Sequence, residues 1–145
     1  MKTLTKKLSI IALAVLMLFA ALAVQAERST DGITYNNMIS ASVDCSITSS
    51  GKLTASMSVA GIPGTTTKIG VELSVGIRVF GTTYMPVFIG YPNNVWTDSV
   101  NASSYNNTFS INVPSHGRYK VTVIYTVEGT GGAADVVERS DTAVY

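Results

Sequence analysis

Apolar and polar residues alternate along most of the chain after residue 38, and this period of two predicts β-strands. The segment 39–47 has apolar residues at its odd positions and Ser, Asp or Thr at the even positions between them. The segment 53–59 repeats the pattern, and the Gly-containing turn between the two predicts a hairpin. The strongest pattern is at 69–79, where six apolar residues alternate with polar residues or glycine. None of these segments has the three- and four-residue spacing of an amphipathic helix.

Further segments complete the expected set of about seven strands. Residues 84–91 form a shorter apolar segment, and Pro86, which cannot donate a backbone hydrogen bond, places it at a sheet edge. The stretch 92–107 is rich in Asn and Ser, and we expect it to be irregular. The remaining strands are expected at 108–113, at 118–127 and, with a looser pattern, at 134–145. Short strands without a helix predict an all-β fold, an antiparallel sandwich of two sheets or a barrel.

The first 26 residues have the pattern of a secretory signal peptide. Three lysines precede a long apolar run, which ends at the small residues Ala23 and Ala26. A transmembrane anchor is the alternative, because the run is close to the roughly 18–20 residues that cross a bilayer. The charged residues directly after Ala26 favour cleavage between Ala26 and Glu27. We therefore expect one secreted domain, 27–145, without a stable membrane anchor.

Charge argues against two classes of partner. Three of the ten basic residues lie in the first 26, which leaves seven Lys and Arg against nine Asp and Glu and a net charge of −2. The sequence shows no basic patch, so composition gives no electrostatic case for binding nucleic acid or anionic lipid.

Cys45 is the single cysteine, so an intramolecular disulfide is excluded. It shares the alternating face of Val43 and Ile47, which predicts a thiol that packs as a small hydrophobic group. An intermolecular disulfide and a nucleophile are the less favoured alternatives.

The segment before 118–127 predicts a corner of the fold. Gly117, Tyr119 and Val121 have a spacing that resembles the tyrosine corner of immunoglobulin-like sandwiches, in which the hydroxyl bonds to the backbone a few residues upstream. Gly117 is expected to allow a tight turn. His116, the only histidine, is then an exposed corner residue, because no second histidine or carboxylate lies near it in the sequence.

The chain from about Tyr35 to Tyr145 also resembles a family of small secreted proteins of Gram-positive bacteria. The resemblance rests on the segments "ISAS", "SSGKLTASMSVAG", "TKIGVELSV" and "GRYKVTVIYTVEG". It implies an Ig-like or fibronectin-III-like β-sandwich, and it supplies no functional residue.

Catalytic motifs are absent from the sequence, so we expect no enzyme, no cofactor and no metal site. The chain has no Gly-x-Ser-x-Gly segment, and its acidic residues are scattered. Asp135, Glu138 and Asp141 are three residues apart, a spacing that points them to different sides of a strand. We expect a solvated face there.

The stretch 92–107 and the residue before it hold the aromatic residues Tyr91, Trp96 and Tyr105 among asparagines and serines. Aromatic rings beside amides and hydroxyls suit a sugar ring or a peptide, so these three residues are the candidate binding site for a glycan or a cell-surface protein. The alternative is that Trp96 folds inward and caps the core.

Three functions remain open from the sequence. The favoured one is a non-catalytic, secreted, monomeric binding or adhesion module. The second is a secreted toxin or bacteriocin-like effector that oligomerises on membranes. The third is an eight-stranded outer-membrane barrel, which is disfavoured because several strands are shorter than the roughly 9–11 residues needed.

Overall fold

The computed structural model describes residues 34–145, and the expected cleavage site at Ala26 and Glu27 lies outside them. Contacts divide the chain into two units, Met1–Thr34 and Tyr35–Tyr145. Every residue of the buried core of the described chain belongs to the second unit.

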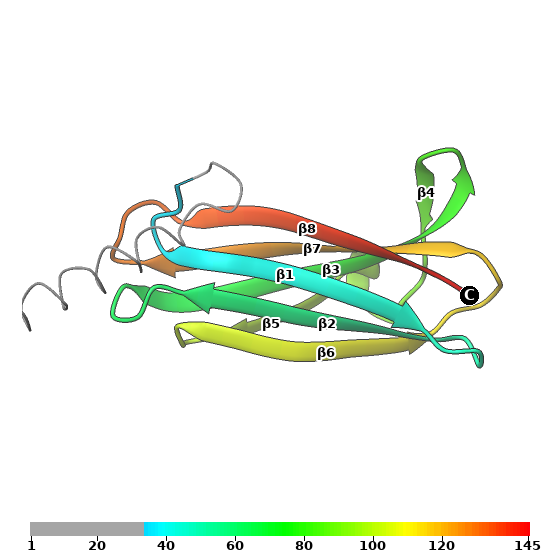
Figure 1. Ribbon diagram of the computed structural model, residues 1–145, viewed down its shortest axis with the longest axis horizontal. Coiled ribbons are helices and arrows are strands. Elements are labelled where there is room, and N and C mark those ends of the chain that lie inside the picture. The colour runs from blue at the N-terminus through cyan, green and yellow to red at the C-terminus, as the bar shows by residue number, and fades with distance from the viewer. Residues whose placement is uncertain (1–33) are drawn as a thin grey trace, which may run out of the picture. The chain divides into compact units, whose positions relative to one another are not determined.

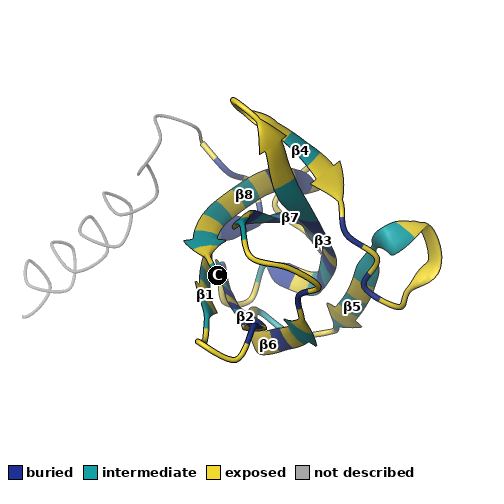
Figure 2. Cartoon of the chain, turned by 90° about the vertical axis from the view of Figure 1, so that its right-hand side faces the viewer, coloured by how far each residue is buried: buried dark blue, intermediate teal, exposed yellow. Residues whose placement is uncertain are grey.

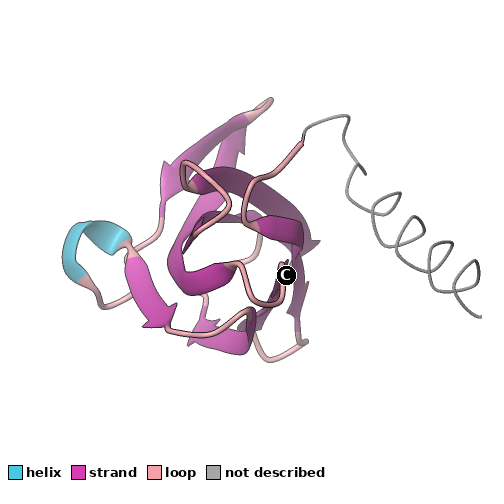
Figure 3. Cartoon of the chain, turned by 90° about the vertical axis from the view of Figure 1, so that its left-hand side faces the viewer, coloured by secondary structure: helices cyan, strands magenta, loops and turns pink. Residues whose placement is uncertain are grey.

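Eight strands follow one another along the described residues, and one 3-10 turn, η1 (Pro92–Asn94), precedes the fifth strand (Figure 3). The strands are β1 (Met38–Ile47), β2 (Lys52–Gly61), β3 (Thr66–Phe80), β4 (Thr83–Pro86), β5 (Trp96–Val100), β6 (Ser104–Asn112), β7 (Arg118–Gly129) and β8 (Asp135–Val144).

The strands form two antiparallel sheets that pack face to face (Figure 1). The smaller sheet has the order β1-β2-β6, and the larger has the order β4-β3-β7-β8. β5 also pairs with β3, beside its first half, whereas β4 pairs with its second half. This order corresponds to strands A-B-E and C-F-G of an immunoglobulin-like sandwich. The predicted fold class is confirmed, with eight strands in place of about seven.

The core consists of the alternating residues that the sequence indicates. Leu53, Ala55, Met57 and Val59 of β2 are buried, as are alternate residues of β7 opposite them. Figure 2, an end view, shows the strands arranged around the core and coloured by burial. Val79 differs, because the end of β3 extends past the sandwich and leaves this side chain 52% exposed.

Two predicted boundaries are wrong. The stretch 92–107 is not irregular throughout, since it contains β5 and the beginning of β6. The strand expected at 84–91 is only the four residues of β4, at the sheet edge that Pro86 predicts, and the rest is loop. Val87 still donates a 2.8 Å backbone hydrogen bond to Val75 before the chain leaves the sheet.

The edges of the two sheets meet at β1 and β8, which run parallel and are joined by side chains of β8. The contacts are Asp135 with the amide of Asn37 (2.6 Å), Arg139 with the carbonyl of Ala41 (3.1 Å) and Asp141 with the amide of Cys45 (2.7 Å). These side chains satisfy backbone groups that a neighbouring strand would otherwise bind. Asp135 and Asp141 are thus structural residues, and the expected solvated face holds only for the exposed Glu138.

The Cys45 thiol lies half-buried against the core. Burial, together with the negative charge of Asp141, raises the pKa of Cys45 to about 12. The thiol is therefore protonated at neutral pH, when it is a poor nucleophile.

The corner before β7 is closed by Tyr119, whose buried hydroxyl donates a 2.6 Å hydrogen bond to the carbonyl of Ser115. The backbone of Gly117 does not have a positive φ, so the turn itself does not require glycine. A Cβ at Gly117 would lie 3.1 Å from Cδ1 of Ile77, a tight contact that a small shift of the Ile77 side chain would have to relieve.

The exposed ring of His116 stacks on Tyr145, with 4.0 Å between the ring centroids and 21° between the planes. The backbones of Gly117 and Tyr145 exchange two hydrogen bonds beside this stack. His116 therefore covers the end of the last strand from outside.

Candidate functional site

A groove crosses the outer face of the larger sheet, over β3, β5 and β7. It consists of two open hollows that share Glu72 and Thr97 in their walls. The first, of about 490 Å³, lies over the first half of β3. The second, of about 350 Å³, lies under the loop that carries Tyr91 and Asn93.

The floor of the first hollow is Gly70. Its neighbours in register are Ser99 of β5 and Thr126 of β7. A Cβ built on Gly70 would meet nothing closer than the Thr126 carbonyl oxygen at 3.8 Å, which is ordinary contact. The missing side chain therefore gives the groove its depth, while the backbone would accept a larger residue.

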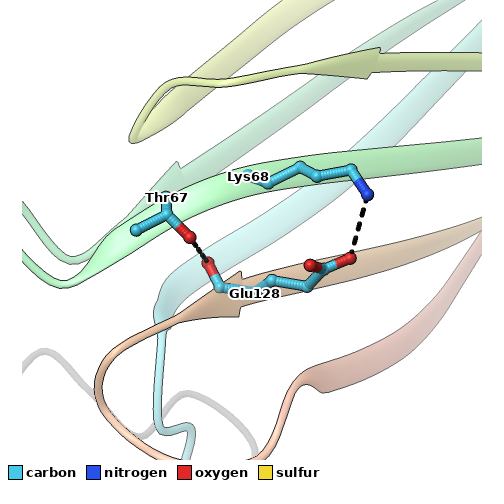
Figure 4. A network of polar contacts seen from close by, with 3 residues as sticks. All are labelled: Thr67, Lys68 and Glu128. Atoms are coloured by element: carbon cyan, nitrogen blue, oxygen red, sulfur yellow. Dashed lines mark hydrogen bonds and ion pairs between the residues drawn. The ribbon is translucent and has the colours of Figure 1, made fainter.

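One wall is a small polar network between β3 and β7, drawn in Figure 4. Lys68 Nζ lies 3.1 Å from a carboxylate oxygen of Glu128, and the Thr67 hydroxyl donates to the Glu128 carbonyl at 3.3 Å. Both charged side chains are nearly half exposed, so the pair adds little stability. Its effect on the groove is to neutralise the charge of Lys68.

The opposite wall is anchored by Asp98 of β5. Its carboxylate accepts hydrogen bonds from the Tyr105 hydroxyl (2.9 Å) and from the Asn107 amide (3.0 Å), both on β6. The Tyr105 bond is the main reason that the pKa of Asp98 is lowered, so Asp98 is ionised at neutral pH. Burial raises the pKa of Tyr105 to about 12, and the hydroxyl keeps its proton. These bonds also join the two sheets at the edge opposite β1 and β8.

Three exposed polar side chains that β3 and β5 contribute to the groove have no partner within residues 34–145. They are the carboxylate of Glu72 and the hydroxyls of Thr97 and Ser99. Thr97 lies directly beside Glu72 in the β3–β5 register. The groove thus presents one free carboxylate and two free hydroxyls in a short row.

The three aromatic residues of the candidate site have different environments. Tyr91 is 44% exposed at the second hollow, with its ring 6.3 Å from Phe109. Trp96 is half-buried, and its ring lies 5.5 Å from Phe109, on the edge of the core. Tyr105 is 6% exposed, so its ring faces the core and only its hydroxyl reaches the groove wall. Tyr91 alone presents a ring to a ligand.

The polar groups of the groove were not singled out from the sequence. The available signal was Gly70, which stands between Lys68 and Glu72 on the polar face of the strongest strand. A glycine in the middle of a strand often marks a close approach or a hollow. The partner strand β5 was needed to complete the site.

Within residues 34–145, no group of three or more His, Cys, Asp or Glu side chains is placed to hold a metal ion. No helix in the same residues has the length and hydrophobicity required to cross a membrane.

No protein family model matches the sequence, and no curated protein matches it either. Among solved structures, the chain is similar to the sporulation control protein Spo0M of Bacillus subtilis, at 15% identity and a TM-score of 0.31. The match covers 72% of this chain and 47% of that one.

Proposed function

We propose that this protein is a non-catalytic, secreted binding module that holds part of a glycan in the groove over β3, β5 and β7. The observation that carries the proposal is the exposed ring of Tyr91 at one end of a row of free polar groups, Glu72, Thr97 and Ser99. Sugars offer an apolar face to an aromatic ring and hydroxyls to such a row.

The charge of the groove narrows the class of glycan. Lys68 is neutralised by Glu128, while the Glu72 carboxylate is not paired with a cation in the described chain. The groove is therefore negative, which disfavours acidic sugars. Neutral sugars, or sugars with a free amino group, are the proposed ligands.

The groove is built on paired strands, so its shape exists before a ligand binds, and binding does not require a segment of the chain to fold. Its walls are two strands of a sheet, and Asp98 is held by side chains of the opposite sheet. A pre-formed site loses little conformational entropy when a ligand binds.

A glycan array followed by titration of the best ligand tests the proposal. Tyr91→Ala and Gly70→Leu should each weaken binding by about tenfold or more, the first by removing the ring and the second by filling the floor. Phe80→Ala is the matched control, because it removes an exposed aromatic ring at the tip of the β3–β4 hairpin, away from the groove. Binding that survives both groove variants would exclude this site.

Secretion is tested separately, by sequencing the N-terminus of protein recovered from the medium of expressing bacteria. The proposal expects Glu27 as the first residue. Recovery of uncleaved protein in the cell alone would contradict it.

A further inference from the structure

The β3–β4 hairpin, Arg78–Pro86, projects from the sandwich as an arm (Figures 1 and 2). Its apolar side chains are unusually accessible: Phe80 is 85% exposed, Met85 56% and Val79 52%. The turn at Gly81 has a φ of 53°, and a Cβ there would meet no atom within 4 Å. The tip thus has no packing partner within residues 34–145, and it exposes groups that burial would stabilise.

Three cations surround the base of this arm. Lys120 of β7 is paired with Gly76 of β3, and its Nζ lies 5.0 Å from the centre of the Tyr84 ring. Arg78 and Arg118, both exposed, are the next residues beyond the last pair of β3 and β7. The sheet register therefore gathers at one place three residues that are separated in the sequence.

Within residues 34–145, acidic side chains are absent from this end of the outer face. Glu138 is exposed on β8, but it pairs with Ile124, four positions along β7 from Lys120, or about 13 Å. In the pairing of β7 with β8, Asp141 is closer to Lys120 than Glu138 is, but its carboxylate accepts a hydrogen bond from the amide of Cys45 on β1. The other acids of the described chain are Asp44, Glu72, Asp98, Glu128 and Asp135. A net charge of −2 in the expected mature chain hides this local concentration of positive charge.

We infer that the arm and its cations form a docking surface for an anionic lipid membrane. Exposed aromatic and aliphatic residues at a narrow tip can enter the interfacial region of a bilayer, while adjacent Arg and Lys meet lipid phosphates. A protein partner is the less suitable occupant, since a stable interface covers about 800 Å² on each side and this tip is a two-stranded projection. The inference does not depend on the glycan groove.

Vesicle co-sedimentation tests the inference with the chain from Glu27 onward, which contains the whole folded unit. The probes are vesicles of phosphatidylcholine alone and vesicles of equal parts phosphatidylcholine and phosphatidylglycerol. We expect binding at least about tenfold tighter to the anionic vesicles, weakening as salt is raised. Phe80→Ser and the double variant Arg78→Gln with Arg118→Gln should each reduce this binding by about tenfold or more.

Two matched controls separate the arm from general surface effects. Both controls lie at the end of the larger sheet that carries the groove. Val136→Ser removes an exposed apolar side chain of β8, and Lys68→Gln removes one cation of β3. Both should leave vesicle binding unchanged. The inference is overturned if no vesicle is bound, if the controls lose as much binding as the arm variants, or if neutral vesicles bind equally well. It is also overturned if sedimentation equilibrium shows a dimer that Phe80→Ser dissociates, since the tip would then serve a second copy.

Discussion

The hydroxyl of Tyr119 is bonded to the carbonyl of Ser115, four residues upstream, across the corner that leads into β7. Tyr119→Phe keeps the ring and removes only this bond, leaving the carbonyl to water. We expect the free energy of unfolding in urea to fall by about 1 kcal/mol or somewhat more. Tyr84→Phe is the control, because the Tyr84 hydroxyl makes no hydrogen bond within residues 34–145. Equal stability of the two variants would contradict the corner assignment.

The bond between Asp141 and the amide of Cys45 predicts an acid-sensitive contribution to stability. This bond is the main cause of the lowered pKa of Asp141. A lowered carboxyl pKa stabilises the fold above the ordinary value of about 4, and the stabilisation is lost as pH falls through the lowered pKa.

Asp141→Asn should therefore unfold more easily than the wild type at pH 7, by about 1 to 2 kcal/mol. The difference should shrink as the pH falls through the lowered pKa of Asp141, because the wild-type carboxylate then becomes protonated as well. Urea unfolding at a series of pH values measures it. Parallel pH profiles of the two proteins would mean that the bond contributes nothing.

Cys45 should be nearly inert to alkylation in the folded protein. With a pKa of about 12, the thiolate is scarce at pH 8, and iodoacetamide should react at least about a hundredfold more slowly than with the chain unfolded in urea. Asp141→Asn removes a negative charge that raises this pKa, so labelling should accelerate. Mass spectrometry of timed samples gives both rates; fast labelling of the folded wild type would contradict the raised pKa of the half-buried thiol.

Trp96 and Tyr91 should differ in what their removal does. Trp96→Ala opens a gap beside Phe109 at the edge of the core, and we expect a loss of about 2 to 3 kcal/mol in the free energy of unfolding. Tyr91→Ala should cost about 1 kcal/mol or less, because that residue is 44% exposed and lies in a loop outside the core. Thermal and urea unfolding of the pair decides whether Trp96 belongs to the core.

The sequence predicts correctly those strands that have one apolar face packed against the core. The alternation at 69–79 is the buried face of β3 as far as Val75, and the turn at 48–51 joins β1 to β2 as expected. Pro86 lies on an edge strand because a proline cannot complete a ladder.

The parts that were missed lie where the sheets meet at their edges. β5 reads Trp-Thr-Asp-Ser-Val, and the polar Asp98 interrupts its apolar face because it bonds to Tyr105 and Asn107 of the other sheet. Asn107 likewise interrupts the apolar face of β6, because its amide donates to Asp98. A binary pattern cannot show such positions, since a bond to a distant strand replaces the expected burial.

The candidate site was predictable only in part for a related reason. Tyr91 was identified as an aromatic residue in a loop, but Glu72 and Thr97 come together through the pairing of β3 with β5. The same holds for Arg78 and Lys120, which sheet register places near each other although 42 positions separate them in the printed sequence. The residue composition counts charges over the whole chain, so it does not show which of them the sheets bring together.

The closure of β1 by carboxylates and a guanidinium has a consequence for handling the protein at low pH. An uncovered strand border is a template on which strands of other molecules add, and that is how amyloid growth starts. Here charged side chains cover the edge in place of a further strand, so protonation of Asp141 removes the charged acceptor of the Cys45 amide. Acidified solutions should therefore form fibrils under conditions in which neutral solutions stay clear.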